Sequence, residues 1–536
     1  MSESYAPELV IGFVAPSGAS FDQVISAAED RLGFYGYGSE RIRLSDWLGE
    51  WAQLEGDHLA RQDLRIEALQ KAGDDFRKAS GHAGSLAFVA IQDIRSARLK
   101  HAARDVDGTA VGEAIAAAEP QGDLERPEIG DDEANHPVPQ LAYLIWSLKN
   151  EKEIEVLRNI YGSRFILFSV YASRDQREEA LSRRIADSYG QIGQARKYRD
   201  RAIRIIDTDE SEDDKDFGQN VRDAYPLADF FIDATSKPTL ESTLDRAIDI
   251  VFGAPFETPT RDEYGMFVAH AAALRSAEMG RQVGAAITTS EGDVVAVGTN
   301  EVPRGGGGQY WPEDHPHDRR EFRLEEDTSD RMKRTLVGQI LDVLKANDWI
   351  AEERKEANSA DLYVALERTR LRDLIEFGRA VHAEMGAIVD AARRGVAVKG
   401  KTMFVTTFPC HHCARHVVAS GIDRLVYIYP YPKSLAPDLH GDAIQAEHLE
   451  LQDDRRVRFE PFLGVAPRQY QNFFTMIERK DKMGRAFPIE DPTRTPRLIE
   501  DERGGVRNVN AYVLREQLAM QESELWFAPE PKKEGT

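Results

Sequence analysis

Cysteine is almost absent from this sequence: only Cys410 and Cys413 occur among 536 residues. Two cysteines three positions apart cannot form the disulfide framework of a small secreted protein. Long hydrophobic runs are also missing, because stretches such as Leu9–Ala15 and Ser85–Ile91 are far shorter than the roughly 20 residues of a membrane-spanning helix. Met1–Ser4 lacks the basic and apolar pattern of a signal peptide. We therefore expect a cytoplasmic protein with no membrane partner.

Positive charge is scarce too. The chain has 69 Lys and Arg against 92 Asp and Glu, a formal net charge of −23. Such a charge repels polyanions, so a nucleic-acid polymer would need a strong local basic patch to bind. A mononucleotide needs only a few cations, and the charge balance therefore favours a small substrate. With 41% hydrophobic and 30% charged residues, the chain is typical of a globular protein with two or three domains.

The chemically distinctive residues that are present gather in two short stretches, His382-Ala383-Glu384 and Pro409-Cys410-His411-His412-Cys413. One histidine and two cysteines would supply three ligands to Zn²⁺ and leave its fourth position open, as in catalytic zinc sites. A glutamate beside such a site can move protons to and from a zinc-bound water. His-x-Glu followed by Pro-Cys-x-x-Cys is typical of zinc-dependent nucleobase deaminases.

The local pattern predicts where these residues lie. Residues 380–394 are predicted to form a helix with His382 and Glu384 in its first turn, and Pro409 suits the first position of a later helix. Cysteines one helical turn apart can converge on one ion, and a helix N-terminus lowers their pKa. A structural zinc site is the alternative; it would need a fourth protein ligand, for which His416 is the nearby candidate.

Residues 1–255 are predicted to form an α/β domain with a mostly parallel sheet. The apolar run Leu9–Val14 leads through a tight loop into a helical pattern that starts at Phe21. Further apolar runs of strand length are Leu86–Ile91, Phe165–Val170 and Phe230–Ile232. Helical stretches separate these runs, which indicates a sheet covered on both faces.

The loop after the first strand resembles the P-loop of small-molecule kinases, and the domain resembles P-loop NTPases. The resemblance is degenerate, because Phe21 stands where the family has its phosphate-binding lysine and Asp22 where it has the Ser or Thr that holds magnesium. It implies weak nucleotide binding at most, through Pro16, Ser17 and Gly18. A structural or regulatory relic that does not transfer phosphoryl groups is the interpretation we favour.

Residues 256–470 are predicted to form a cytidine-deaminase-like α/β/α domain. A helical pattern over Glu263–Met279 precedes a hairpin built from Val283–Thr288 and Val294–Gly298. A helical insertion is expected over about 301–380, and residues 471–536 form a C-terminal extension. Within the insertion, His315 and His317 could bind a second metal, although histidines of a polar surface loop are the more common explanation.

Residues 264–470 resemble the deoxycytidylate deaminase family of zinc deaminases. The stretches that carry the resemblance are the two metal-site motifs together with Gly280–Ile287, Gly298–Asn300 and Ala419–Ile422. The N-terminal P-loop-like domain, the Gly305–Trp311 loop and the Pro430–Ser434 segment are similar to the anti-phage dCTP/dCMP deaminases of bacteria. The resemblance implies hydrolysis of dCTP or dCMP to the uracil nucleotide and ammonia, in defence by nucleotide depletion.

The resemblance also assigns roles to residues. His382, Cys410 and Cys413 would hold zinc, Glu384 would be the catalytic proton carrier, and Asn300 would hold the sugar. Further substrate contacts are expected from the site residue Ala383 and from Lys433, with Arg281 and Arg304 as other candidates for the phosphates. A homo-oligomer is expected, restrained by a regulatory nucleotide or an inhibitory RNA or protein.

Two other functions stay open at this stage. One is a deaminase that edits cytosine or adenine in RNA or single-stranded DNA, which would need a basic channel with aromatic side chains. The other is a non-enzymatic, nucleotide-sensing scaffold, against which the intact Glu384 argues.

Overall fold

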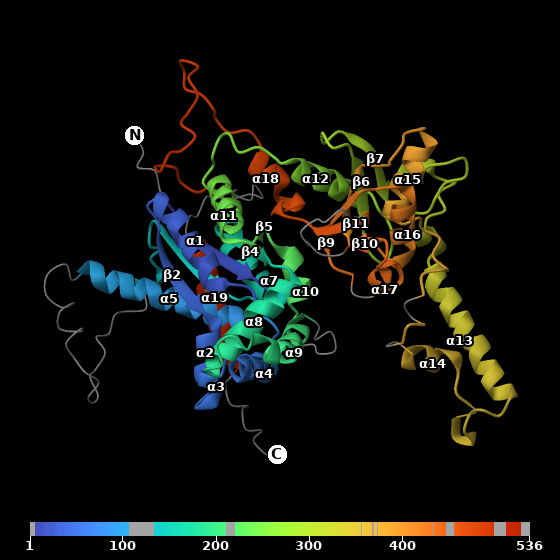
Figure 1. The fold of residues 1–536 in the computed structure, drawn as a ribbon, viewed down its shortest axis with the longest axis horizontal. Helices are drawn as coiled ribbons and strands as arrows, with labels where there is room; N and C mark the ends of the chain where they lie inside the picture. Colours follow the sequence, from blue (N-terminus) through green and yellow to red (C-terminus); the bar gives the residue numbers. More distant parts are fainter. Residues whose placement is uncertain are drawn as a thin grey trace, which may run out of the picture. The chain divides into compact units, whose positions relative to one another are not determined.

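The protein is described by a computed structural model that covers residues 6–106, 133–210, 220–354, 356–366, 369–371, 374–431, 434–445, 455–497 and 511–526. The chain divides into two compact units (Figure 1). Unit 1 combines Met1–Thr258 with Leu463–Thr536, and unit 2 is Pro259–Phe462. Among the residues covered, no helix combines the length and apolar character needed to cross a membrane.

Unit 1 is built on a six-stranded sheet in the order β12-β5-β4-β1-β3-β2. Its strands are β1 (Leu9–Val14), β2 (Gly38–Arg43), β3 (Leu141–Trp146), β4 (Phe165–Tyr171), β5 (Phe230–Asp233) and β12 (Gly464–Val465). The first five are parallel, and β12 is antiparallel to β5. The strand order reverses at β1, because β2 and β3 lie on one side of it and β4 and β5 on the other.

Helices cover both faces of this sheet (Figure 1). Val10 and Val14 of β1 belong to one buried apolar cluster, while Ile11 and Phe13 belong to another, as expected when successive side chains of a strand point to opposite faces. The principal helices of unit 1 are α1 (Phe21–Phe34), α2 (Leu44–Trp51), α4 (Gln62–Ser80), α5 (Ser85–Val106), α7 (Glu151–Tyr161), α8 (Arg174–Ser188), α9 (Arg199–Glu210), α11 (Lys237–Val251) and α19 (Ala511–Trp526).

The α/β class predicted from the sequence is confirmed, but one predicted strand is wrong. Leu86–Ile91 lies within helix α5 and is buried there among the apolar residues of one core cluster. A helix buried on all sides shows a continuous apolar run that cannot be told from a buried strand by periodicity. The likeness of this unit to P-loop NTPases stays a prediction.

Unit 2 contains a second six-stranded sheet, in the order β10-β11-β9-β8-β6-β7. Its strands are β6 (Gly284–Thr288), β7 (Val294–Thr299), β8 (Thr402–Thr407), β9 (Arg424–Tyr429), β10 (Ile444–Gln445) and β11 (Val457–Pro461). The predicted hairpin is confirmed as the antiparallel pair β6 and β7, and β8, β9, β11 and β10 run parallel to one another. The helices are α12 (Arg261–Ala273), α13 (Thr328–Ala346), α14 (Ser359–Ala365), α15 (Ala383–Arg393), α16 (His411–Ser420) and α17 (Ala436–His440).

Glycines allow two helices of unit 2 to pack closely on the sheet. A Cβ at Gly298 of β7 would lie 2.0 Å from the carbonyl oxygen of Ala383 and 2.3 Å from the amide nitrogen of Ala387. A Cβ at Gly284 of β6 would meet the carbonyl oxygen of Ala269 in α12 at 2.0 Å. The absence of a side chain at Gly298 therefore fixes how deeply the first turn of α15 sits against the hairpin.

Candidate metal centre

The two sequence motifs meet at the N-termini of adjacent helices. His382 is the N-cap of α15, Cys410 is the N-cap of α16, and Cys413 lies in the first turn of α16. Two details of the prediction are wrong: His382 precedes the first helical turn, and Pro409 lies outside α16 instead of at its first position. Both N-cap residues have extended backbones, because an N-cap flanks the helix without adopting its dihedral angles.

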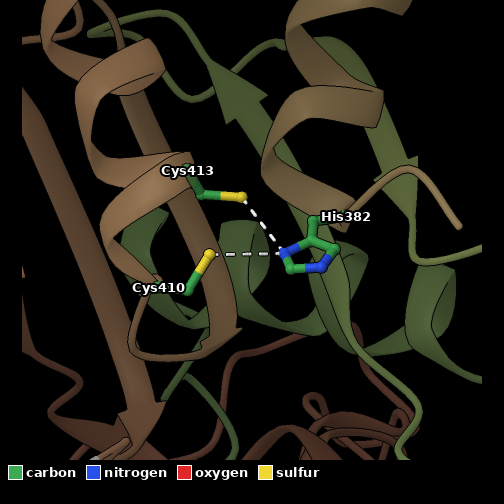
Figure 2. Close-up of side chains that lie close together, drawn as sticks. All are labelled: His382, Cys410 and Cys413. Atoms are coloured by element: carbon green, nitrogen blue, oxygen red, sulfur yellow. Dashed lines mark hydrogen bonds between the residues drawn. The ribbon is translucent and has the colours of Figure 1, made fainter. Parts of the chain in front are cut away.

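The three side chains converge on one point (Figure 2). Nδ1 of His382 lies 3.4 Å from Sγ of Cys410 and 3.4 Å from Sγ of Cys413. All three donor atoms lie within 4.8 Å of one another. A tetrahedral zinc with ordinary Zn–S and Zn–N bond lengths separates its sulfur and nitrogen ligands by about 3.6 Å. The donor set therefore fits Zn²⁺ in both chemistry and spacing.

The charges of this cluster are arranged for metal binding. The hydrogen bond from the Cys413 thiol lowers the pKa of Cys410 to about 3. Cys413, which gives that hydrogen bond and is buried, has a raised pKa. The contact with Cys410 raises the pKa of His382 to about 9. Without a metal, Cys413 and His382 therefore keep their protons. A bound Zn²⁺ would replace these protons.

Glu384 lies in the first turn of α15, next to the metal ligands. Its side chain is only 4% exposed. Burial raises the pKa of this carboxyl, and the positive charge of His382 partly offsets the effect. A carboxyl with a raised pKa accepts a proton more readily near neutral pH, which suits a group that carries protons.

A small cavity of about 170 Å³ adjoins His382. Asn300 lines it, together with Glu278, Lys333 and Arg379, which come from three separate parts of the chain. Burial and nearby carboxylates raise the pKa of Glu278, and its buried Oε2 has no hydrogen-bond partner among the residues described. Sequence reasoning missed these three residues, because they belong to no motif and are joined only by the fold.

The three residues predicted to contact the substrate lie in different surroundings. Asn300 is buried; its side chain accepts a hydrogen bond from the Val283 amide at 2.7 Å and donates one to the Arg281 carbonyl at 2.6 Å. It thus fastens the start of β6 to the end of β7, at the edge of the cavity. Ala383, the first residue of α15, is fully buried. Lys433 lies outside the described residues. Substrate contact by these residues stays a prediction.

Two other predicted sites show no metal cluster. Within the described ranges, the only group of three or more convergent His, Cys, Asp or Glu donors is His382, Cys410 and Cys413, so neither His416 nor the His315/His317 pair joins one. The carboxylates beside that pair are held by arginines instead. Asp314 binds Arg304 at 2.9 Å, and Asp318 binds Arg320 at 2.8 Å. Contact with Arg320 lowers the pKa of Asp318 to about 2.

Pro16, Ser17 and Gly18 lie in unit 1, in the loop between β1 and α1. Gly18 has a φ of +98°, and a Cβ there would meet Arg177 at 2.7 Å, so only glycine fits. The Ser17 amide donates a hydrogen bond to Asp209 at 2.6 Å. Nucleotide binding by this loop stays a prediction.

A histidine and two cysteines converge at paired helix ends, with a buried glutamate beside them, and so offer three of the four ligands of a tetrahedral zinc. Residues 259–429 match the family model described as the cytidine and deoxycytidylate deaminase zinc-binding region. His382, Glu384, Cys410 and Cys413 all lie in this match, which confirms Zn²⁺ as the cofactor. This segment is therefore similar to the zinc-binding region of cytidine and deoxycytidylate deaminases.

Curated relatives agree with this match. The deoxycytidylate deaminase of Enterobacteria phage T2 is 48% identical over 54 residues, which are 10% of this chain and 29% of that enzyme. The Homo sapiens deoxycytidylate deaminase is 27% identical over 166 residues, 31% of this chain and 63% of that enzyme. The chain thus spans less than two thirds of these relatives.

Among solved structures, the dCMP deaminase of cyanophage S-TIM5 in apo form aligns with a TM-score of 0.21 and 15% identity. The alignment covers 38% of this chain and all of that one.

Proposed function

We propose that this protein is a zinc-dependent hydrolase that removes the 4-amino group from the cytosine of deoxycytidine nucleotides. One observation carries the proposal: the buried Glu384 follows His382 at the helix end where Cys410 and Cys413 complete a zinc ligand set. The family match and the relatives named deoxycytidylate deaminase support the same activity. A cytoplasmic location and a homo-oligomeric state, both expected from the sequence, remain part of this proposal.

The chain's own residues divide the chemistry between them. His382, Cys410 and Cys413 would hold the metal, which when bound supplies a water acidified towards neutral pH. Glu384 would accept a proton from that water and pass protons to N3 of cytosine and to the departing amino group. Its raised pKa keeps the carboxyl able to both take up and release a proton.

The cavity beside His382 supports a small substrate. Its volume of about 170 Å³, below the range of typical ligand pockets, suits a single nucleobase. Lys333 and Arg379 bring cations to its wall, and we assign them, with Lys433, to the nucleotide phosphates.

The choice between dCTP and dCMP, and the biological role, belong to the proposal as well. The similarity to anti-phage dCTP/dCMP deaminases favours a role in depleting the deoxycytidine nucleotide pool during infection. Phage plating on cells that express the wild-type chain or its Glu384→Gln variant tests this role. Equal plaque numbers on the two strains would refute it.

The catalytic assignment is tested by Glu384→Gln. We expect the variant to keep its zinc, because the ligands are untouched, and to lose at least a hundredfold in turnover, the usual contribution of a general acid–base group. Glu291→Gln is the matched control, since Glu291 lies in the β6–β7 turn with its side chain 74% exposed. Metal content by mass spectrometry and ammonia release are the measurements. Wild-type turnover by Glu384→Gln would refute the role.

A further inference from the structure

Helix α13 extends away from the sheet of unit 2 and packs against the short helix α14 (Figure 1). Its buried residues are Lys333, Val337 and Leu341. A second line of apolar side chains lies on another side of the helix, and we call it the outer stripe: Met332, Leu336, Ile340 and Val343. Met332 and Ile340 are 38% exposed, and Val343 is 54% exposed. The outer stripe is therefore an apolar surface that unit 2 leaves largely uncovered.

The spacing of the outer stripe is that of a seam between paired helices. Its members follow one another by four, four and three residues, which keeps them on one line along the helix. Steps of three and four residues also place side chains in the seam of a coiled coil. A surface helix needs one apolar stripe to pack on its own domain. Because α13 already buries Val337 and Leu341, its second stripe fits a helix from outside the unit.

The net charge of α13 differs in sign from that of the whole chain. The chain carries a formal net charge of −23, whereas the helix contains four cations and two carboxylates. The cations are Arg331, Lys333, Arg334 and Lys345, and the carboxylates are Asp330 and Asp342. A second copy of the chain is acidic overall, so its electrostatic field attracts this helix.

The outer stripe is complementary to itself when two copies of α13 run antiparallel. Met332 of one copy then lies opposite Val343 of the second copy, and Leu336 lies opposite Ile340. The match is reciprocal, because each of these residues meets the same partner in both directions. Such a reciprocal match is the requirement of an interface with twofold symmetry, the commonest kind in soluble homo-oligomers.

Two charges beside the outer stripe match in the same arrangement. Arg331 and Asp342 are eleven residues apart, about three helical turns, and therefore lie on the same side of α13. The twofold axis of an antiparallel pair carries this side of the helix onto the same side of the second copy. Arg331 of each copy therefore faces Asp342 of the other, and the interface contains this ion pair twice.

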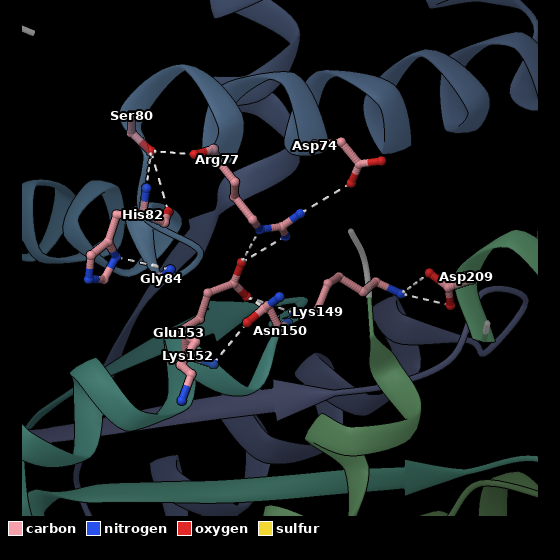
Figure 3. A network of polar contacts seen from close by, with 10 residues as sticks. All are labelled: Asp74, Arg77, Ser80, His82, Gly84, Lys149, Asn150, Lys152, Glu153 and Asp209. Carbon is pink, nitrogen blue, oxygen red and sulfur yellow. Dashed lines mark hydrogen bonds and ion pairs between the residues drawn. The ribbon is translucent and has the colours of Figure 1, made fainter. Parts of the chain in front are cut away.

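Neither of these two charges is held by a close contact within one copy. Arg331 reaches Glu326 only at 3.9 Å, with the two side chains 57% and 44% exposed. Asp342 is exposed and has no ion-pair partner within the described ranges. Buried charges are paired inside one copy instead, as Arg77 and Glu153 of unit 1 are at 2.8 Å (Figure 3). Arg331 and Asp342 are thus available to a second copy.

We propose that α13 is an interface between two copies of this chain, in which the outer stripes pack antiparallel and Arg331 of each copy pairs with Asp342 of the other. The proposal gives the homo-oligomer expected from the sequence a defined surface. Helix α13 also carries Lys333, which lines the cavity beside His382, so the interface lies on an element of the proposed substrate site. The pairing itself does not depend on the reaction, so association and deamination succeed or fail separately.

Sedimentation velocity over a dilution series of the full-length protein tests the proposal without an activity assay. The wild type should sediment as an assembly of at least two copies. Arg331→Asp and Asp342→Arg each place like charges opposite one another twice, so each should raise the dissociation constant by roughly tenfold or more. Arg334→Asp is the matched control and should associate like the wild type, because Arg334 lies on the opposite side of α13, 6.0 Å from the Tyr363 ring.

Mixing the two reversed variants tests the pairing itself. An equimolar mixture of Arg331→Asp and Asp342→Arg should associate about as tightly as the wild type, because an acidic flank then faces a basic one. Thermal melts show whether the variants fold; Val343→Asn, at an exposed position of the outer stripe, replaces a reversal that does not and should also weaken association.

Four results would overturn the proposal. The wild type stays a single chain at every soluble concentration, or a folded variant of Arg331, Asp342 or Val343 associates like the wild type. Alternatively, Arg334→Asp weakens association as much as the two reversals do, or the mixture of folded reversals associates no better than either variant alone.

Discussion

At the scale of single residues, the zinc ligands illustrate how one cluster can hold either protons or a metal. Cys410 is a thiolate over the whole physiological range, because its pKa is about 3. Cys413 and His382 both carry raised pKa values and hold protons at neutral pH. Zinc needs the thiolate and the neutral imidazole, so binding must expel a proton from each of these two side chains.

Zinc affinity should therefore rise steeply with pH. Below the His382 pKa of about 9, two protons compete with the metal, and each lowers the apparent affinity by about tenfold per pH unit. We expect a gain of about a hundredfold between pH 6.5 and 7.5. Competition with a chelator, corrected for the chelator's own protonation, measures it. The same affinity at both pH values would contradict this interpretation of the cluster.

The functional residues that could be predicted from the sequence are those whose spacing along the chain is typical of metal ligands. His382, Cys410 and Cys413 could be found because metal ligands at helix ends recur at fixed intervals. Glu278 and Asp209 could not, since each meets its surroundings through residues distant in sequence. Nothing in the sequence around a lone carboxylate indicates that the side chain will be buried. A pair of cysteines three positions apart, by contrast, indicates a metal site.

At the scale of secondary-structure elements, the contact between α15 and β7 positions the zinc site. Ala383, Ala387 and Ala391 present a fully buried face of small side chains to the sheet. Gly298 lies directly beneath this face. Because His382 and Glu384 begin the same helix, any shift of α15 moves a metal ligand and the proton carrier together.

Gly298→Ala should accordingly damage both stability and activity. The added Cβ would overlap the backbone of α15, with contacts of 2.0 and 2.3 Å, and overpacking of this kind costs about 1–3 kcal/mol. Denaturant unfolding and ammonia release measure the two losses. Gly305→Ala is the control, because a Cβ at Gly305 would meet no atom within 4 Å and its φ is ordinary. Unchanged turnover in Gly298→Ala would show that α15 tolerates displacement.

The elements that could be predicted were those with a clear period. The β6–β7 hairpin follows from two short β-type runs joined by a polar turn, and helix α15 from the helical pattern of its sequence. β2 was missed because its sequence, Gly-Ser-Glu-Arg-Ile-Arg, is polar and its burial comes mainly from Ile42. Leu86–Ile91 was misassigned for the opposite reason, since it is apolar on every side within α5.

At the scale of the whole molecule, unit 1 is assembled from both ends of the chain. Arg98 of α5 is fully buried between Glu8 and Glu516, at 2.5 Å from each. Tyr512 of α19 donates a further hydrogen bond to Glu8 at 2.7 Å. Helix α19 is thus joined to the start of the chain. No sequence pattern connects residues 8, 98 and 516, which is why this closure could not be predicted.

Removing one carboxylate from this cluster should destabilise unit 1. Glu516→Ala leaves the Arg98 guanidinium with one buried partner in place of two, and breaking a buried pair in this way costs about 3–5 kcal/mol. Glu522→Ala, at an exposed position of the same helix, should cost little. Urea unfolding compares the two. Equal midpoints would show that the Glu516 carboxylate adds nothing to the stability of unit 1.

We propose that the zinc site acts on free deoxycytidine nucleotides. The most direct test incubates the purified zinc-loaded protein with dCTP, dCMP, CTP and a cytosine-containing oligonucleotide, and measures ammonia and uracil products by chromatography. We predict conversion of dCTP or dCMP, with the oligonucleotide unchanged. Conversion of the oligonucleotide alone, or no product from any of the four, would contradict the account.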